Sequence, residues 1–175
     1  YTHSGVLSSA TAMDKILSKE IFIKNNILTP NFIKYDFKKI SKNKTIKKIE
    51  KKLNFPVVIK PVSEGSSVDV FICTKKNFIK NLNKLIKDKE VLIEEYIGGR
   101  EIQVAILGKK KLGAIELKPK RKFYDYKAKY STKAKTEHII PVDLPPKKMN
   151  KVLEIALKAH KLLKCRGVTR SDFKF

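Results

Sequence analysis

The sequence is poor in the residues that mark disulfide-rich, zinc-binding or membrane-spanning proteins. It has only 2 cysteines, Cys73 and Cys165, which lie far apart and without a cluster of histidine or cysteine. This excludes a disulfide framework and gives no zinc motif, so we expect two reduced thiols. A run of about 18 apolar residues, as a transmembrane helix needs, is absent. The first residues also lack the pattern of a signal peptide, so we expect a soluble cytoplasmic protein with no membrane partner.

Acidic residues and arginine are scarce beside lysine. Lys and Arg number 40 against 17 Asp and Glu, which gives a net charge of +23 and invites a nucleic-acid interpretation. Arginine, which base and phosphate recognition favours, stands only at Arg100, Arg121, Arg166 and Arg170. We interpret the charge as a solvated lysine surface, of the kind that AT-rich coding produces, and expect no specific nucleic-acid partner. A basic nucleic-acid-binding module is kept as the alternative from a different class.

Helices and strands alternate along the chain, with hairpins inserted, which predicts an α/β protein built of α+β lobes. The 42% hydrophobic content is normal for a globular protein. Apolar spacing predicts helices over 8–26, around 46–53, over 77–87 and from 145 onward. Strands are predicted over 32–35, 55–60, 68–72, 91–96, 101–107, 112–117 and 169–175. The polar stretch 119–136 is longer than most connections, which suggests a function.

The segment around Lys60 has the character of a phosphate site. Lys60 ends an apolar strand and precedes Pro61, and a lysine there can reach phosphate oxygens as a point charge. Gly65, Ser66 and Ser67 then lack bulk, so that backbone amides can approach a phosphate closely. A surface lysine followed by a plain hairpin turn is the alternative interpretation.

A second polar segment follows the apolar strand 91–96. Glu94 and Glu95 end this strand, and Glu101 comes after Gly98 and Gly99. These carboxylates suit the polar ring edge of a ligand and a ribose diol. They also suit an ordinary surface turn.

Motifs in one order and spacing resemble the D-alanine–D-alanine ligase family over essentially the whole chain. They are 13–15, 55–61, 64–68, 91–97, 123–130 and 165–173. The run 123–130 is the most specific. Residues 1–5 also resemble the residues with which sequences of the family begin this region.

The resemblance implies the ATP-grasp fold, with two subdomains and a nucleotide cleft between them. It implies a segment 1–14 that leads in from a missing N-terminal domain, a small central subdomain over 15–96 and an incomplete C-terminal subdomain over 97–175. The chain starts at Tyr1 rather than Met and stops inside a predicted strand at Phe175, so we expect a truncated fragment.

The reaction implied by the resemblance is ATP-dependent. ATP phosphorylates the carboxylate of one D-alanine, and the amine of a second attacks the acyl phosphate to give the dipeptide for peptidoglycan synthesis. Such chemistry needs charge neutralisation on the phosphoryl group more than a nucleophilic side chain. Another ATP-grasp carboxylate–amine ligase, using D-lactate or D-serine, is the alternative; the tyrosine-rich loop favours D-alanine. The parent enzyme is expected as a homodimer, and the fragment alone is expected to be inactive.

Residue roles follow from the resemblance alone. Lys15 and Lys60 would contact the α- and β-phosphates, and Ser66 and Ser67 would close over them. Glu94 and the backbone of Glu95 and Ile97 would contact adenine. Glu101 would contact the ribose. The catalytic residues are Lys129 near the γ-phosphate, Tyr130 and Ser66 on the substrate side, and Arg170 at the oxyanion. Asp172 would hold Mg²⁺ or Mn²⁺. The family's glutamate and asparagine that complete this metal site come after Phe175.

Three positions depart from the family pattern. Asp69 stands at a usual glycine, Lys127 at a usual glutamate and Ala134 at a common loop glycine. A carboxylate at Asp69 would repel phosphates unless it points away from the loop, and we expect that it does. Histidines without metal-like spacing, which we interpret as structural or surface residues, are His3, His138 and His160.

Overall fold

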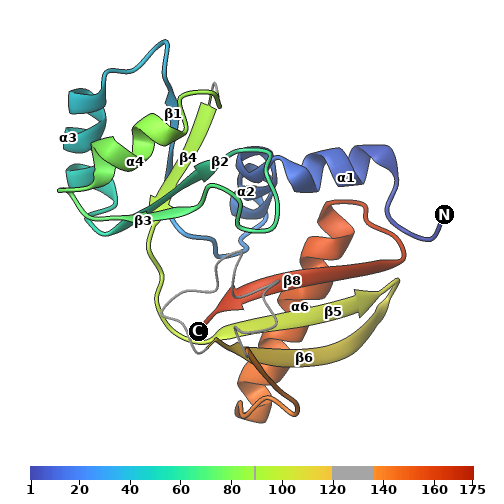
Figure 1. Cartoon of the computed structure of the whole chain (residues 1–175). Coiled ribbons are helices and arrows are strands. Elements are labelled where there is room, and N and C mark those ends of the chain that lie inside the picture. Colours follow the sequence, from blue (N-terminus) through green and yellow to red (C-terminus); the bar gives the residue numbers. More distant parts are fainter. Residues whose placement is uncertain (89, 120–135) are drawn as a thin grey trace. The chain divides into compact units, whose positions relative to one another are not determined.

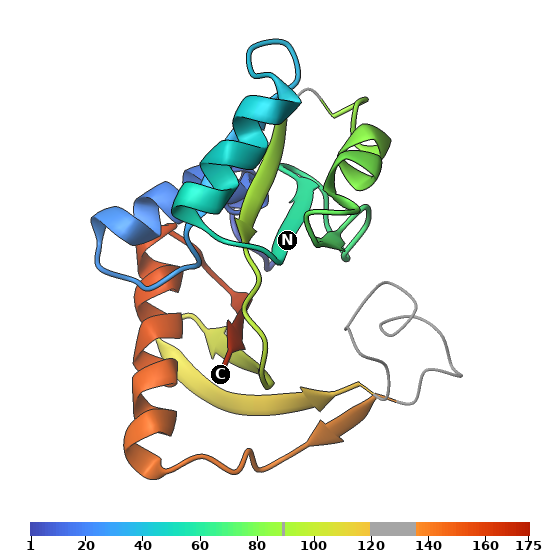
Figure 2. The same ribbon diagram turned by 90° about the vertical axis from the view of Figure 1, so that its left-hand side faces the viewer.

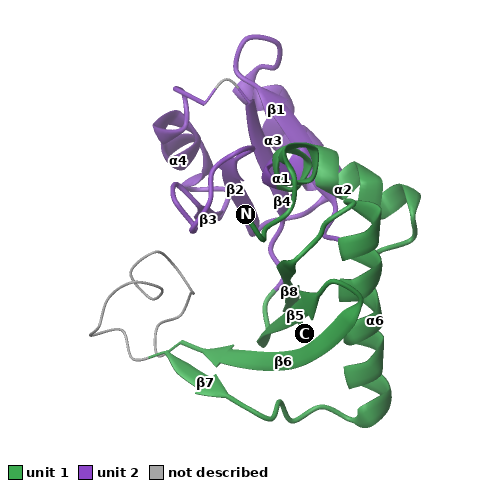
Figure 3. Cartoon of the chain, turned by 90° about the vertical axis from the view of Figure 1, so that its right-hand side faces the viewer, with its two compact units in different colours: residues 1–12, 17–28, 98–175 green, residues 13–16, 29–97 purple. Residues whose placement is uncertain are grey.

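The computed structural model describes residues 1–88, 90–119 and 136–175, which form two compact units. Unit 1 contains residues 1–12, 17–28 and 98–175, and unit 2 contains residues 13–16 and 29–97 (Figure 3). The domain boundaries implied by the resemblance stay a prediction.

Unit 2 is built on an antiparallel sheet with two helices on one of its faces (Figure 1). The strands are β1 (Phe32–Asp36), β2 (Val57–Pro61), β3 (Phe71–Cys73) and β4 (Glu90–Glu95), in the order β1-β4-β2-β3. Helices α3 (Lys42–Lys52) and α4 (Phe78–Lys84) supply Ile49, Phe78 and Leu82 to the core. In β2, Val57 and Ile59 point into this core, so Lys60 points to the opposite face. Alternation along β2 thus places the apolar side chains in the core and Lys60 on the other face of the sheet.

The predicted single helix over 8–26 is wrong, because the chain forms α1 (Val6–Met13) and α2 (Lys15–Lys24). The break lies at Asp14, whose Oδ1 accepts a hydrogen bond from the backbone N–H of Ile16 at 3.0 Å. This short side chain caps the new helix. The N–H of Lys15 leaves the helical pattern and donates to the carbonyl of Val62 at 3.1 Å. The apolar stripe runs through the break, which is why periodicity missed it.

Two other elements of unit 2 are shorter than predicted. The strand expected over 68–72 begins only at Phe71, because Val68 lies in a turn and donates its N–H to the carbonyl of Gly65 at 3.0 Å. Helix α4 ends at Lys84, where a turn closes with a bond from the N–H of Asp88 to the carbonyl of Leu85 at 2.9 Å. The first turn therefore lies between β2 and β3, and the second lies between α4 and β4.

Unit 1 is a second antiparallel sheet, covered on one face by a long helix (Figure 2). Its strands are β5 (Glu101–Leu107), β6 (Lys110–Lys118), β7 (Glu137–Ile139) and β8 (Val168–Lys174), in the order β7-β6-β5-β8. Helix α6 (Pro146–Leu162) packs Val152 and Ala156 against Val104 and Ile106. The short strand β7 was not predicted. The face of the sheet turned away from α6 carries the polar side chains of β5 and β8.

The first residues of the chain are bound to the turn between α6 and β8. Ser4 Oγ donates to the carbonyl of Arg166 at 3.0 Å, and Ser8 Oγ donates to the carbonyl of Lys164 at 2.7 Å. The Arg166 guanidinium lies 5.4 Å from the centre of the Tyr1 ring, a cation–π contact. This turn leads directly into β8.

Both cysteines are free thiols, and Cys73 is buried. Over the described ranges, no helix has the length and apolarity that a membrane span requires.

His160 makes the stability of unit 1 dependent on pH. It is buried on α6 with its Nδ1 2.7 Å from the Thr169 hydroxyl, and burial lowers its pKa from the ordinary value. The unfolded chain therefore binds a proton at this histidine more readily than the folded one. The contribution of His160 to stability is fully present above the unfolded pKa of about 6.5 and is lost as pH falls below it. Urea unfolding across this range should show the loss in the unchanged chain and in the His138→Asn control. An equal loss in His160→Asn would assign it to another group.

Candidate functional site

Lys60 and Glu94 meet on the face of the unit 2 sheet that is turned away from its helices. Strands β2 and β4 are neighbours, with Val58 opposite Glu94 and Lys60 opposite Leu92. Residues paired in this way share a face. The ammonium of Lys60 forms an ion pair with Glu94 Oε1, and the two side chains are 21% and 10% exposed. A half-buried ion pair therefore stands where the sequence predicted a phosphate ligand and an adenine ligand.

Lys15 brings a second ammonium to the same region. Its Nζ donates to the carbonyl of Val62 at 3.1 Å and to the carbonyl of Glu64. Burial lowers the pKa of Lys15, and the nearby charge of Lys60 lowers it further. The break at Asp14 is what turns Lys15 toward the hairpin. Apolar contacts beside it are made by Ile16, Phe32, Val62 and Leu92.

The hairpin tip, residues 62–70, holds unusual backbone conformations. Ser66 and Ser67 have φ of 52° and 60°, and Asp69 has φ of 53°. This left-handed region costs a residue other than glycine roughly 1–2 kcal/mol. Such conformations recur at ligand-binding segments, where the surrounding contacts hold them. The tip is therefore a shaped loop rather than a plain hairpin turn.

Glu95 and Ile97 were predicted to meet adenine through their backbone. The N–H of Glu95 donates to the carbonyl of Asn31 at 3.1 Å, and Glu95 Oε1 accepts from the N–H of Asn31 at 2.6 Å. Glu95 thus ties the end of β4 to the segment before β1. Ile97 is 39% exposed. Their ligand contacts stay predictions.

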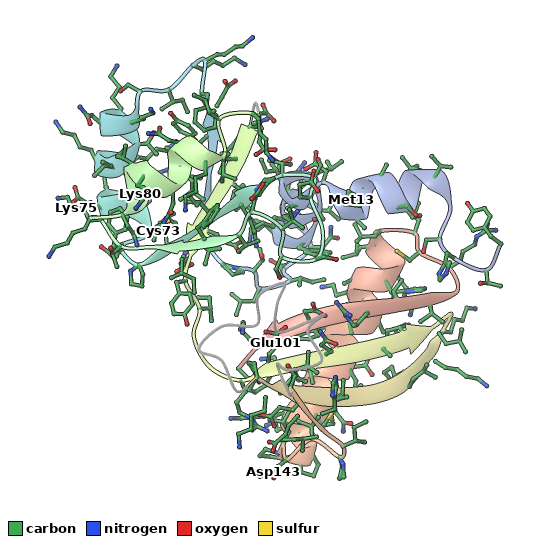
Figure 4. All side chains as sticks on the ribbon, viewed as in Figure 1. Met13, Cys73, Lys75, Lys80, Glu101 and Asp143 are labelled. Carbon is green, nitrogen blue, oxygen red and sulfur yellow. The ribbon has the colours of Figure 1, made fainter. Side chains whose placement is uncertain are left out.

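In unit 1, the polar face of the sheet collects the predicted residues of β5 and β8. Figure 4 labels Glu101 among them. Arg170 holds Asp172 through two hydrogen bonds, at 2.8 Å from Nε and 3.2 Å from Nη2. Glu101 accepts from Lys174 Nζ at 2.9 Å. The predicted oxyanion ligand and metal ligand are therefore each other's partners in this structure.

Gln103 was not predicted and lies opposite Asp172 on β5. It is 7% exposed, and its Nε2 has no hydrogen-bond partner in the part of the chain that the structure describes. Gln103 is two residues after Glu101 on β5, so strand alternation in the sequence could have placed it on the same face.

The remaining predicted residues lie elsewhere. Lys129 and Tyr130, with the departures Lys127 and Ala134, fall outside the described residues. The carboxylate of Asp69 forms an ion pair with Lys87, with Oδ2 and Nζ 3.1 Å apart. Within residues 1–88, 90–119 and 136–175, no three side chains of His, Cys, Asp or Glu gather as metal ligands would.

Comparison with protein families and curated proteins shows one consistent likeness. The family model described as "D-ala D-ala ligase C-terminus" matches residues 21–175. A D-alanine–D-alanine ligase of Pelagibacter ubique (strain HTCC1062) is 62% identical over 175 residues, which are 100% of this chain and 57% of that protein. The chain thus spans little more than half the length of this relative.

Solved structures show the same likeness. A D-alanine–D-alanine ligase from Bacillus anthracis is 36% identical, with a TM-score of 0.84 over 100% of this chain and 56% of that one. A structure of the Bacillus anthracis enzyme complexed with ATP gives 33% identity and a TM-score of 0.79, over 100% and 55%. The VanG D-Ala:D-Ser ligase from Enterococcus faecalis is 27% identical, with a TM-score of 0.84 over 99% and 51%.

Proposed function

Since the chain belongs to the D-ala D-ala ligase C-terminus family and has the ATP-grasp fold of its structural relatives, we propose that it is the ATP-binding part of a D-alanine–D-alanine ligase. The whole protein phosphorylates the carboxylate of one D-alanine with the γ-phosphoryl group of ATP. The amine of a second D-alanine then attacks the acyl phosphate, and phosphate leaves as the peptide bond forms. D-alanine and ATP are its small-molecule partners, and the cytoplasm, where both are consumed, is its location.

One observation carries the proposal: the site in unit 2 brings the ammonium groups of Lys15 and Lys60 close enough to repel each other. Lys15 is partly desolvated and repelled by Lys60, and both effects lower its pKa. An anion that binds between such groups relieves the repulsion and gains charge-assisted hydrogen bonds. The α- and β-phosphates of ATP are the anions we assign to Lys15 and Lys60, with Ser66 and Ser67 closing over them. The ATP complex of the Bacillus anthracis relative supports this choice of nucleotide.

The other roles are proposed on the family resemblance. Glu94 and the backbone of Glu95 and Ile97 contact adenine, and Glu101 contacts the ribose. Lys129 neutralises the γ-phosphate, Tyr130 and Ser66 order the substrate, and Arg170 steadies the oxyanion. Neutralising and orienting groups of this kind accelerate acyl and phosphoryl transfer without a protein nucleophile.

Asp172 is a suitable but partial ligand for Mg²⁺ or Mn²⁺. Magnesium prefers a few carboxylates together with phosphate oxygens and water, and the Asp172 carboxylate is 43% exposed on β8. When bound, the ion would offset negative charge on the phosphates. Arg170 would then exchange its present bonds to Asp172 for bonds to the substrate.

A ligase that takes D-serine as second substrate is the alternative. The likeness to the VanG enzyme, at 27% identity, supports it. Dipeptide formation by the full-length parent protein from D-alanine alone, against D-alanine with D-serine or D-lactate, separates these possibilities.

Calorimetric titration of the chain with ATP and with adenosine tests the nucleotide site. We expect Lys15→Met to weaken ATP binding by about tenfold or more, since a charge-assisted hydrogen bond contributes roughly 1.5–3 kcal/mol. Adenosine binding should be unchanged. Lys24→Met, at the far end of α2, removes the same charge as a control. Equal affinity of ATP for the two variants, or no ATP binding by the unchanged chain, would refute the assignment.

A further inference from the structure

The ion pair between Asp69 and Lys87 joins two parts of unit 2 that are distant in the sequence. Asp69 lies at the end of the hairpin tip with φ of 53°, and its Oδ2 is 3.1 Å from Lys87 Nζ. Lys87 belongs to the turn after α4, which also contains the bond from the N–H of Asp88 to the carbonyl of Leu85. The Asp69 side chain is 31% exposed and the Lys87 side chain is 70% exposed, so solvent reaches the pair mainly from the Lys87 side. The carboxylate that departs from the family pattern is therefore engaged by a residue outside the tip.

This pair completes a set of contacts that holds the tip from both ends. At its start, Lys15 binds the carbonyls of Val62 and Glu64. At its end, Lys87 binds Asp69. Between these points Ser66 and Ser67 keep left-handed backbones, which surrounding contacts must stabilise.

Lys87 also balances charge around the tip. Its pKa is raised, chiefly by the hydrogen bond to Asp69, and the carboxylates of Asp88 and Glu64 add to the effect. These nearby carboxylates favour the charged form of the Lys87 ammonium. Without it, Asp69 would present an uncompensated negative charge on the loop that the proposed function assigns to phosphate binding.

We propose that Lys87 is a positioning residue for nucleotide binding, which orders the hairpin tip and neutralises Asp69 so that the tip can receive phosphates. This inference rests on the proposed function, because only a phosphate-bearing ligand makes the charge of Asp69 unfavourable. Lys87 itself need not touch the ligand.

The test compares Lys87→Ala with Lys80→Ala in the 175-residue chain. Lys80 is exposed on α4, and its removal changes the net charge equally. We expect Lys87→Ala to weaken ATP binding by about threefold to fivefold, the range of a partly exposed ion pair, and to leave adenosine binding unchanged. Amide exchange at residues 65–69 should also become faster. Adding Asp69→Asn, which tolerates the left-handed conformation, should raise ATP affinity again by removing the uncompensated charge, while amide exchange at residues 65–69 stays fast.

Two outcomes would overturn the inference. One is that Lys87→Ala and Lys80→Ala have equal ATP affinity and equal exchange at the tip. The other is that Asp69→Asn fails to raise ATP affinity at all in the Lys87→Ala background. If the unchanged chain does not bind ATP, the proposed function fails separately, and amide exchange at the tip alone decides whether Lys87 orders it.

Discussion

Alanine in place of Gly167 is expected to destabilise unit 1 by roughly 3 kcal/mol, which is at the upper end for single substitutions. Gly167 has φ of 66°, and a Cβ built there would lie 2.0 Å from the carbonyl oxygen of Thr2. The backbone conformation alone costs alanine roughly 1–2 kcal/mol. The contact adds to this, because Thr2 must move and its neighbours Ser4 and Ser8 are bound to the same turn.

Gly108→Ala is the matched control. Gly108 has φ of 57°, and a Cβ at this position meets nothing within 4 Å. Only the conformational cost of roughly 1–2 kcal/mol should appear. Equilibrium urea unfolding followed by circular dichroism measures both variants. Equal losses would mean that the close approach of Thr2 contributes nothing to the stability of unit 1.

Lys60→Met is expected to have two separate effects. Removing one partner of a partly buried ion pair leaves the Glu94 carboxylate without this ammonium, which should cost unit 2 about 2–4 kcal/mol. Removing the charge should also weaken ATP binding by about tenfold or more. Urea unfolding and calorimetric titration measure the two effects independently.

The double variant Lys60→Met with Glu94→Gln distinguishes the structural from the binding role. With the carboxylate neutralised, most of the lost stability should return, since an intact buried ion pair is worth little against a neutral pair. Affinity for ATP should stay low. Lys75→Met breaks the exposed pair with Glu50 and should change neither quantity by more than about 1 kcal/mol. Recovery of ATP binding in the double variant would assign Lys60 a purely structural role.

The sequence was informative at β2. The apolar run predicted a strand that ends at Lys60, and the structure has β2 over Val57–Pro61. The face on which Lys60 lies, opposite Val57 and Ile59, was seen only in the structure. The pairing of β2 with β4, which unites Lys60 with Glu94, is a long-range choice that local spacing does not determine. The family resemblance implied that both residues contact one nucleotide, but it did not give the pairing of their strands.

Other features were missed because they depend on single contacts. The apolar stripe continues through Asp14, so the helix break there was visible only as a capping residue within the stripe. The partner of Asp69 was one of many exposed lysines, and nothing in the sequence distinguishes Lys87 from the others. Alternation along β5 places Gln103 on the face of Glu101, but its burial depends on the pairing of β5 with β8, which spacing along one strand does not reveal.

The central position of β4 in the sheet of unit 2 has a consequence for the fidelity of folding. Ile93 packs in the apolar core of unit 2, and Glu94 lies on the opposite face of the sheet. A slip of β4 by one residue would exchange the two, placing an unpaired carboxylate among Ile49, Phe78 and Leu82. Such an alternative would be strongly disfavoured. Glu94, which we assign to ligand recognition, therefore also helps to fix the register of β4.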